Sequence, residues 1–221
     1  GHDDQMIARL QDPALRERIK REMDDPNVTA WENQWYGSGG GDGVMVSSVL
    51  DNSLREYEGL TLTEIGRRQG KDPRDALMDL VIADKGQTAC IIAIMREDDV
   101  RAALAHPLIS IDTDSGARAE DGPLSESRSH PRAWGTFPRI LGRYVREERL
   151  LTLEEAIRKM TSRPAARMGL LDRGVLRPGL IADVTIFDPA TIRDVSTFEA
   201  PTRYSVGVRH VFVNGRAVVS D

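Results

Sequence analysis

Residues 88–115 read T-A-C-I-I-A-I-M-R-E-D-D-V-R-A-A-L-A-H-P-L-I-S-I-D-T-D-S, and this stretch decides the fold class. The continuous apolar run over 89–95 predicts a buried strand, and 97–104 is typical of a helix. The segment 108–112 predicts another strand, which ends at a run of polar residues. A strand, a helix and a strand in this order are typical of a parallel α/β sheet.

The residues before this stretch continue the same pattern. Residues 44–50 predict a further buried strand, and helices are expected between it and residue 88. One begins at Thr61, with Glu64 at capping-box spacing, and the next begins at Asp72-Pro73. Three strands cannot close a barrel, which takes about eight, and three alone would leave two apolar edges bare. We therefore expect one part of a larger sheet.

The chain becomes β-like beyond Asp172. Strands are predicted at 184–187, 208–213 and 218–219. Asn214-Gly215, between the last two, predicts a hairpin because both residues tolerate a positive φ. These strands are typical of a small sheet packed beside the α/β part.

Further helices and one loop complete the expected organisation. A helix covers 13–23, another covers 136–148, and a third begins at Thr152 with Glu155 at capping-box spacing. The glycine-rich run 37–41 lacks the Lys-Ser/Thr pair that completes a phosphate-binding loop. We expect it to be a mobile active-site or connecting loop.

Composition excludes several classes of protein. The 221 residues carry 30 Lys and Arg against 35 Asp and Glu, a net charge of −5 that gives no electrostatic reason to bind nucleic acid. No apolar stretch approaches the eighteen or so residues of a membrane helix. The single cysteine, Cys90, excludes an internal disulfide and suits the cytoplasm, and its apolar neighbours predict inert core packing.

The first residues also carry information. The chain begins Gly1-His2-Asp3, with no Met and no signal segment. We therefore expect the polypeptide to be part of a longer gene product, and His2 is not taken as native.

Candidate site residues follow the segment 108–112. Asp112 and Asp114 lie where the carboxyl end of a parallel strand would meet a ligand crevice. A carboxylate there suits a general base or a ligand of a hard metal ion. The alternative interpretation is a turn-forming aspartate, a common role in such loops, and spacing alone leaves both open.

The histidines and arginines narrow the choice of chemistry. The chain has four His and neither an H-x-H nor an H-E-x-x-H motif, so it does not supply the three or four ligands of a zinc centre. His106 and His210 are interpreted as structural, whereas His130, in a polar loop, is a candidate for facing a ligand. Arg132 is a candidate for binding a substrate carboxylate, and Arg139 is interpreted as a structural ion pair.

The run H-P-R-A-W-G-T-F-P-R-I-L-G-R-Y over 130–144 closely resembles the loop after the last barrel strand of D-aminoacylases, the N-acyl-D-amino-acid deacylases of the amidohydrolase superfamily. The resemblance covers most of the chain from about residue 44 and is most specific between 130 and 215. It continues through K-M-T-S at 159–162, G-V-L-R-P-G at 174–179, A-D-V-T-I-F-D-P-A-T at 182–191 and V-F-V-N-G at 211–215.

This resemblance implies a fold, a reaction and site residues. The fold would be the C-terminal part of a TIM-like metal-dependent (β/α)8 barrel over residues 1–170, with an inserted segment around 30–88 and β-sandwich strands over 171–221. The reaction would be hydrolysis of the amide of N-acyl-D-amino acids with one or two zinc ions. Asp114 would bind metal and act as acid and base, and Arg132 would bind the substrate carboxylate. Ser47, Ser48 and His130 would line the substrate pocket.

Two departures from the family pattern matter. Family members carry Gly-Ser-Asp where this chain has Asp112-Thr113-Asp114, so a second carboxylate lies close to the expected base and could repel its charge. The family's H-x-H pair, bridging Cys and two further His belong to its N-terminal half, and this chain carries none of them. Cys90 lies in the wrong segment to replace the bridging Cys.

The resemblance therefore predicts the C-terminal half of a zinc-dependent deacylase, inactive alone and completed by an N-terminal half that is a separate chain or a removed segment. An alternative is another amidohydrolase that acts on cyclic amides, like dihydroorotase or hydantoinase. A second alternative is a non-catalytic half-barrel that binds a partner through its open edges.

Overall fold

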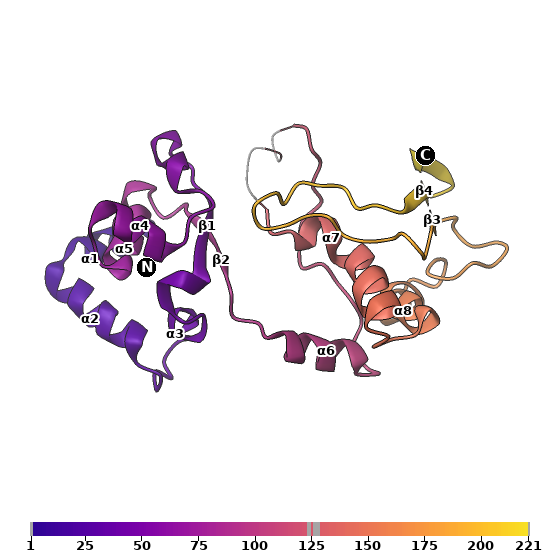
Figure 1. Cartoon of the computed structure of the whole chain (residues 1–221), viewed down its shortest axis with the longest axis horizontal. Helices are drawn as coiled ribbons and strands as arrows, with labels where there is room; N and C mark the ends of the chain where they lie inside the picture. The colour runs from indigo at the N-terminus through magenta and orange to yellow at the C-terminus, as the bar shows by residue number, and fades with distance from the viewer. Residues whose placement is uncertain (1, 123–124, 126–128, 221) are drawn as a thin grey trace. The chain divides into compact units, whose positions relative to one another are not determined.

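The computed structural model describes residues 2–122, 125 and 129–220. The chain forms two compact units (Figure 1), and each is described by itself. The first unit holds Gly1–Met95 with Glu126–His130, and the second holds Arg96–Ser125 with Pro131–Asp221. Among the described residues, no helix has both the length and the apolar character that a membrane span requires.

Local sequence provides caps for several helices of the first unit. Asp12 accepts a hydrogen bond from the backbone N–H of Ala14 at 2.8 Å, and Pro13 follows at the first helical position. Thr61 and Glu64 form the predicted capping box, and Gly70, with φ of 64°, ends that helix. The helices of this unit are α1 (Asp3–Gln11), α2 (Pro13–Asp24), α3 (Gln34–Gly37), α4 (Leu62–Gln69) and α5 (Pro73–Ala83), with 3₁₀ turns η1 (Gly40–Gly43) and η2 (Asn52–Tyr57).

The glycine-rich run 37–41 connects α3 to η1, which agrees with the predicted connecting loop. It spans the end of α3 and the start of η1, and the Asn33 side chain caps α3 by accepting from the backbone N–H of Tyr36 at 3.1 Å. The connection therefore consists of the capped end of α3 and a 3₁₀ turn, joined at Ser38 and Gly39.

The strands of the first unit are β1 (Val44–Ser48) and β2 (Ala89–Ile92), and they pair antiparallel, with Val44 opposite Ile92 and Val46 opposite Cys90. The predicted parallel arrangement is therefore wrong for this pair. Residues 49–88, which include α4 and α5, connect the two strands. These helices pack against each other, and the chain then enters β2 in the direction opposite to β1. Local apolar patterning does not encode that direction.

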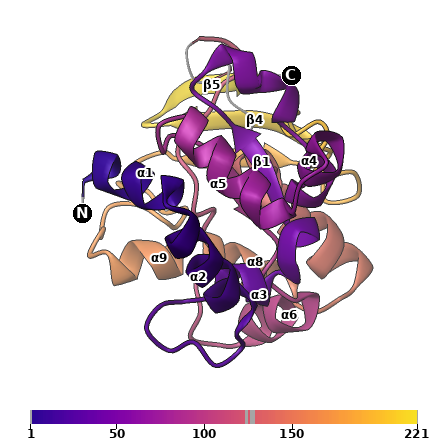
Figure 2. The ribbon, with the colours of Figure 1, turned by 90° about the vertical axis from the view of Figure 1, so that its left-hand side faces the viewer.

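A compact apolar cluster stabilises the first unit. Both α1 and α4 contact α5, and Figure 2 shows these helices with β1. Cys90 packs against this cluster as a half-buried side chain, and burial raises the pKa of its thiol, which agrees with the predicted inert role. The buried members of the cluster are Val44, Val46, Leu62, Ile65, Ala76 and Leu80.

The second unit is built on helices that pack around a different apolar cluster. They are α6 (Glu97–Ala105), α7 (Arg132–Arg139), the π-helix η4 (Ile140–Glu147), α8 (Leu153–Met160) and α9 (Ser162–Arg167). The buried members of this cluster are Leu104, Ile111, Ile140, Leu141, Tyr144, Leu151, Ala156 and Ile192.

The helix predicted over 136–148 begins earlier and changes its winding. Pro138 lies inside α7 and has no N–H, so the Trp134 carbonyl lacks its usual intrahelical partner. The Ser205 hydroxyl donates to that carbonyl at 3.0 Å instead. The residues that follow form the π-helix η4, a winding that is rare and often found at functional sites.

Two further predictions differ in this unit. Residues 108–112 form no strand: Ile111 is buried in the core and its N–H donates to the Lys159 carbonyl at 3.1 Å, so a helix residue takes the place of a strand partner. The capping box predicted at Thr152 forms one of its two hydrogen bonds. The Glu155 N–H donates to the Thr152 hydroxyl at 3.2 Å, but the Glu155 carboxylate pairs with Arg158 at 2.7 Å.

The β-rich tail is confirmed. Strands β3 (Val184–Phe187), β4 (Val208–Val213) and β5 (Arg216–Ser220) form one antiparallel sheet in that order. Asn214 and Gly215 join the last two with φ of 51° and 76°, the positive values predicted for this hairpin. Every residue of β5 is exposed.

Candidate functional site

The predicted base and the predicted carboxylate-binding arginine lie together in the second unit. The Arg132 guanidinium lies 3.1 Å from the Asp114 carboxylate, measured from Nη2 to Oδ2. The Asp114 side chain is 87% exposed and that of Arg132 44%, so the pair is open to solvent. An ion pair this exposed contributes at most about 1 kcal/mol to stability, so its position bears on binding more than on folding.

The backbone at Asp114 has an unusual conformation. Its φ is +45°, in the left-handed region that few residues other than glycine adopt. Aspartate tolerates this region better than most residues, because its short side chain can bond to nearby backbone groups. A functional side chain on a sharp turn after an anchored segment is held out toward solvent, where it can meet a ligand.

The segment that leads to Asp114 is anchored by α8. The Lys159 amine is fully buried and donates to the carbonyls of Leu104 and His106, each at 2.6 Å. The Lys159 carbonyl in turn accepts from the N–H of Ile111. Burial lowers the pKa of the Lys159 ammonium, and the two carbonyls replace the water that it loses.

Sequence reasoning missed Lys159. It lies three residues after Ala156 and two after Ile157, within a helix whose apolar residues face the core. A lysine inside such an apolar stripe is the signal that could have identified it, because a buried amine needs acceptors close by.

Arg132 is held at the start of α7 by close packing. A Cβ on Gly135 would lie 2.7 Å from the Asp194 Cβ, so only glycine lets this turn approach Asp194. Arg139 pairs with the same Asp194 at 3.0 Å, as its structural interpretation predicted. The Ser196 hydroxyl donates to the Pro131 carbonyl at 3.2 Å. The loop around residues 194–196 therefore fixes the first turn of α7 on both sides.

In the described contacts, the Asp112 carboxylate bonds within its own turn and not to the Asp114–Arg132 pair. It is exposed, and its Oδ1 accepts from the N–H of Thr113 at 2.6 Å. This is the turn-forming role that was the alternative interpretation. His106 likewise forms a turn, accepting from the N–H of Leu108 at 3.2 Å through Nδ1.

The other predicted site residues belong to the first unit. Ser47 is 6% exposed in β1, Ser48 is half-buried opposite Ala89, and His130 is half-buried. The structure thus brings Asp114 and Arg132 together and places the two serines and His130 in the other unit. The pocket-lining roles of these three residues stay predictions.

The described residues do not fit a zinc ion by themselves. Over residues 2–122, 125 and 129–220, no three His, Cys, Asp or Glu side chains lie close enough together to hold a metal ion. A protein zinc site takes three or four such ligands. Asp114 is one carboxylate, and its oxygen Oδ2 contacts a guanidinium.

The chain resembles known proteins over most of its length. The Amidohydrolase family matches residues 67–219. A D-aminoacylase from Alcaligenes xylosoxydans xylosoxydans is 42% identical over 163 residues, which cover 74% of this chain and 31% of the relative. An N-acyl-D-glutamate deacylase from the same organism is 44% identical over 163 residues, with the same coverage of 74% and 31%.

A solved structure agrees with these matches. It is the crystal structure of N-acyl-D-glutamate deacylase from Bordetella bronchiseptica, complexed with zinc and a phosphonate inhibitor that mimics the reaction's tetrahedral intermediate. This chain superposes on it with a TM-score of 0.71 and 38% identity, covering 83% of this chain and 36% of that one. The chain spans about a third of the length of the curated relatives it matches.

Proposed function

Because the chain belongs to the amidohydrolase family, we propose that it forms part of a hydrolase that cleaves the amide bond of N-acyl-D-amino acids. The observation that carries this proposal is the Asp114–Arg132 pair at 3.1 Å. It joins a proton-transfer group to an anion-binding group, and an N-acyl-D-amino acid offers a scissile amide and a carboxylate. The similarity to two deacylases over 74% of the chain supports the substrate class.

In the proposed reaction Asp114 transfers a proton and Arg132 binds the substrate. Water attacks the amide carbonyl carbon, and the Asp114 carboxylate takes the proton that the water loses. Asp114 then gives this proton to the amine nitrogen as the C–N bond breaks, which releases a carboxylate and a D-amino acid. Arg132 binds the substrate carboxylate with its planar fork of N–H donors, and this fixes the amide relative to Asp114.

The metal ligands are proposed to come from polypeptide outside this chain. The zinc-bound deacylase is the basis for expecting one or two zinc ions, while the described residues here supply a single candidate ligand, Asp114. We propose that an N-terminal half of the same barrel, as a separate chain or a cleaved segment, supplies the rest.

The domain boundaries follow from this assignment. Residues 1–170 are proposed to complete the barrel, with the inserted segment around 30–88, and 171–221 are proposed to join the β-sandwich. Ser47, Ser48 and His130 are proposed to line the substrate pocket of the assembled enzyme. Exposed apolar side chains on the tail sheet support this view, since Val218 is 59% exposed and Val219 46%.

Hydrolysis of N-acetyl-D-amino acids by the assembled enzyme tests the proposal. We expect this chain with its N-terminal half to hydrolyse them and to leave cyclic amides unchanged. Asp114→Asn should lower the turnover rate by a factor of about 100 or more, the usual contribution of a general acid–base group. The matched control is Asp112→Asn, which removes a nearby carboxylate that contacts only its own turn in the described contacts.

Three outcomes would overturn parts of this assignment. Preferred hydrolysis of cyclic amides would indicate a different amidohydrolase, and full activity of Asp114→Asn would indicate a non-catalytic interaction subunit. Tight stoichiometric zinc with full turnover in this chain alone would refute the need for a second half.

Arg132 has its own test. Arg132→Lys keeps the charge but loses the planar fork, so we expect a higher KM for N-acetyl-D-amino acids and little change for the corresponding amino acid amides. An equal effect on both substrate types would show that Arg132 does not bind the carboxylate.

A further inference from the structure

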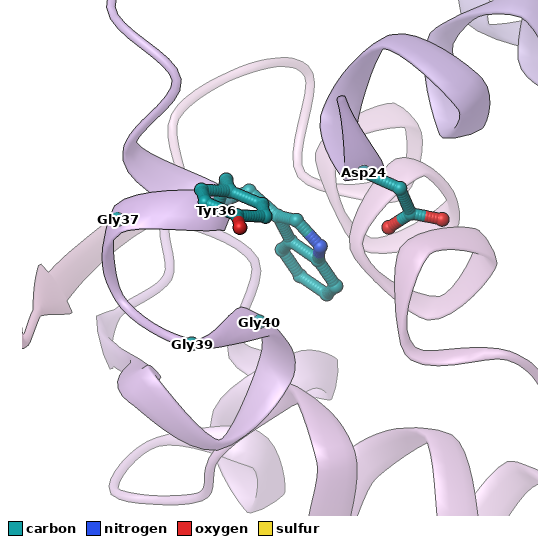
Figure 3. A pocket seen from close by; sticks show the side chains of 6 residues that line it. Asp24, Tyr36, Gly37, Gly39 and Gly40 are labelled. Carbon is teal, nitrogen blue, oxygen red and sulfur yellow. The ribbon is translucent and has the colours of Figure 1, made fainter. Parts of the chain in front are cut away.

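A concave site lies in the first unit, apart from the Asp114–Arg132 pair. Its cavity has a volume of about 540 Å³ and lies between the end of α2 and the turn that follows α3. Figure 3 shows Tyr36 and Asp24 on opposite sides of it, with Gly39 and Gly40 on the turn beside it. The lining residues are Asp24, Trp35, Tyr36, Gly37, Gly39 and Gly40.

Two glycines with positive φ form one wall of this cavity. Gly39 and Gly40 have φ of 80° and 86°, a conformation that side chains rarely adopt. A Cβ on Gly39 would meet nothing within 4 Å, whereas a Cβ on Gly40 would lie 3.8 Å from the Trp35 ring. The wall of the cavity on this side is therefore bare backbone and the indole that lies against it.

The aromatic wall combines a fixed ring with an accessible one. Trp35 packs against the apolar cluster of the first unit, so its indole is held in place by the core. The next residue, Tyr36, is 52% exposed. An anchored indole and an exposed phenol present π-faces, which carry negative electrostatic potential.

The charged wall is negative. Asp24 is the last residue of α2. The C-terminal end of a helix carries a partial negative charge, which adds to the negative potential of the Asp24 carboxylate. Arg74 is the cation that pairs with Asp24, but Asp72 also holds this guanidinium, at 2.6 Å. One guanidinium is therefore shared by two carboxylates, which leaves an excess of negative charge beside the aromatic rings.

The neighbouring cations of α2 do not cancel this excess. The Lys20 ammonium pairs with Asp75 at 3.0 Å and with Glu17, and Arg16 pairs with Asp75 and Asp79. These cations are occupied by carboxylates along α2 and α5.

We propose that this pocket binds a small organic ammonium ion. Such a cation would place its alkyl groups over the indole and phenol and its charge near the Asp24 carboxylate, the arrangement by which aromatic sites recognise quaternary ammonium groups. The cavity volume lies within the range of small-molecule sites. The ligand is a cation, whereas the N-acyl-D-amino acids of the proposed reaction are anions, so this site is a separate one.

Titration with choline, followed by the indole N–H resonances of the ¹⁵N-labelled chain, tests the proposal. The comparison ligand is 3,3-dimethylbutan-1-ol, which has the shape of choline without its charge. We expect choline to shift the Trp35 resonance, assigned with Trp35→Phe, and to bind about tenfold more tightly than the neutral alcohol. Binding that shifts Trp31 or Trp134 instead, equal affinity for both ligands, or no binding would each overturn the proposal.

Variants separate the role of Asp24 from general effects. Asp24→Asn should weaken choline binding by about fivefold or more and leave the neutral alcohol unaffected. The matched control is Asp25→Asn, because Asp25 accepts from the N–H of Asn27 and does not line the cavity. If Asp24→Asn fails to fold, Tyr36→Leu replaces it, since Tyr36 is exposed and should show the same loss of choline binding. Unchanged choline affinity in a folded variant would refute the site.

Discussion

The two units differ in how deeply their β-strands are buried. In the first unit, β1 buries Val44, Val46 and Ser47, and the helix α4 contributes buried Leu62 and Ile65 to the same cluster. In the second unit, every residue of β5 is exposed and the middle of β3 is exposed as well. The first sheet therefore contributes fully buried apolar side chains to its core, whereas in the second sheet Phe187 and Val208 pack against the core as partly buried side chains.

This difference shows what positions the candidate site. The Asp114–Arg132 pair belongs to the unit with the exposed sheet, and helices rather than strands fix its two arms. Polar contacts from a buried lysine anchor the segment before Asp114, and the packing of Gly135 on Asp194 anchors Arg132. In this unit the order of the site rests on a few specific contacts, so single substitutions there should have large effects.

The largest effect is expected for Lys159→Met. Methionine fills a similar volume but removes two hydrogen bonds from a charged donor: the buried Leu104 carbonyl loses its Lys159 partner, while the His106 carbonyl keeps the N–H of Ile109 at 3.2 Å. The loss of both bonds, with the Leu104 carbonyl left unsatisfied, should lower the free energy of unfolding of the second unit by about 2–4 kcal/mol. Hydrogen exchange of residues 104–111, together with urea unfolding, measures this loss.

The matched control is Arg158→Met, one residue earlier. Arg158 is 43% exposed and pairs with Glu155 on the helix surface, so its loss should change the free energy of unfolding little. Equal destabilisation by the two substitutions would contradict the anchoring role of Lys159.

Local backbone chemistry explains which elements could be predicted from the sequence. The Thr61–Glu64 box, the helix that begins at Pro13 and the Asn214-Gly215 hairpin each depend on residues a few positions apart, and all three formed as predicted. The direction of β2 against β1 and the absence of a strand at 108–112 depend on contacts far apart in the sequence. Apolar patterning contains no information about which of these distant segments meet.

The candidate site also contains residues that could be predicted from the sequence and one that could not. Asp114 and Arg132 could be identified as candidates because a family pattern covers them, and the structure brings these two side chains together. The anchoring by Lys159 was missed because a lysine is ordinarily read as a solvent-exposed residue. Its role depends on carbonyls 55 and 53 residues away, which no local pattern reveals.

A second, smaller effect compares one substitution in both sheets. Val46→Ala removes two methyl groups from a fully buried position in β1, and we expect the first unit to lose about 2 kcal/mol of unfolding free energy. Val219→Ala removes the same atoms from β5, where the side chain is 46% exposed, and should cost about 0.5 kcal/mol or less. Unit-resolved hydrogen exchange measures both losses. A comparable loss at Val219 would show that the tail sheet is buried in solution.

A third comparison concerns the two helix caps. Thr61→Ala removes a hydroxyl that accepts from the Glu64 N–H at 3.2 Å and donates to the Glu64 carboxylate at 3.1 Å, and should cost about 1–2 kcal/mol. Thr152→Ala removes a single cap bond of 3.2 Å, because the Glu155 carboxylate is held by Arg158, and should cost about 0.5–1 kcal/mol. Thermal unfolding of both variants checks the order, and a larger loss at Thr152 would reverse the comparison.

The smallest expected effect is a difference in acid sensitivity. Hydrogen bonds from Arg101 and then Arg143 hold the pKa of Glu148 at about 2, below its ordinary 4.5, and Arg74 holds the pKa of Asp72 at about 2, below 3.8. A folded-state pKa below the unfolded value gives stability that is present above the unfolded pKa and is lost as the pH falls toward the folded pKa. The contribution of Glu148 to the second unit should therefore begin to fall near pH 4.5, and that of Asp72 to the first unit near pH 3.8. Acid titration of hydrogen exchange in each unit measures this order. Glu148→Gln should flatten the dependence in the second unit alone, and an unchanged slope there would show that its carboxylate does not set the acid response.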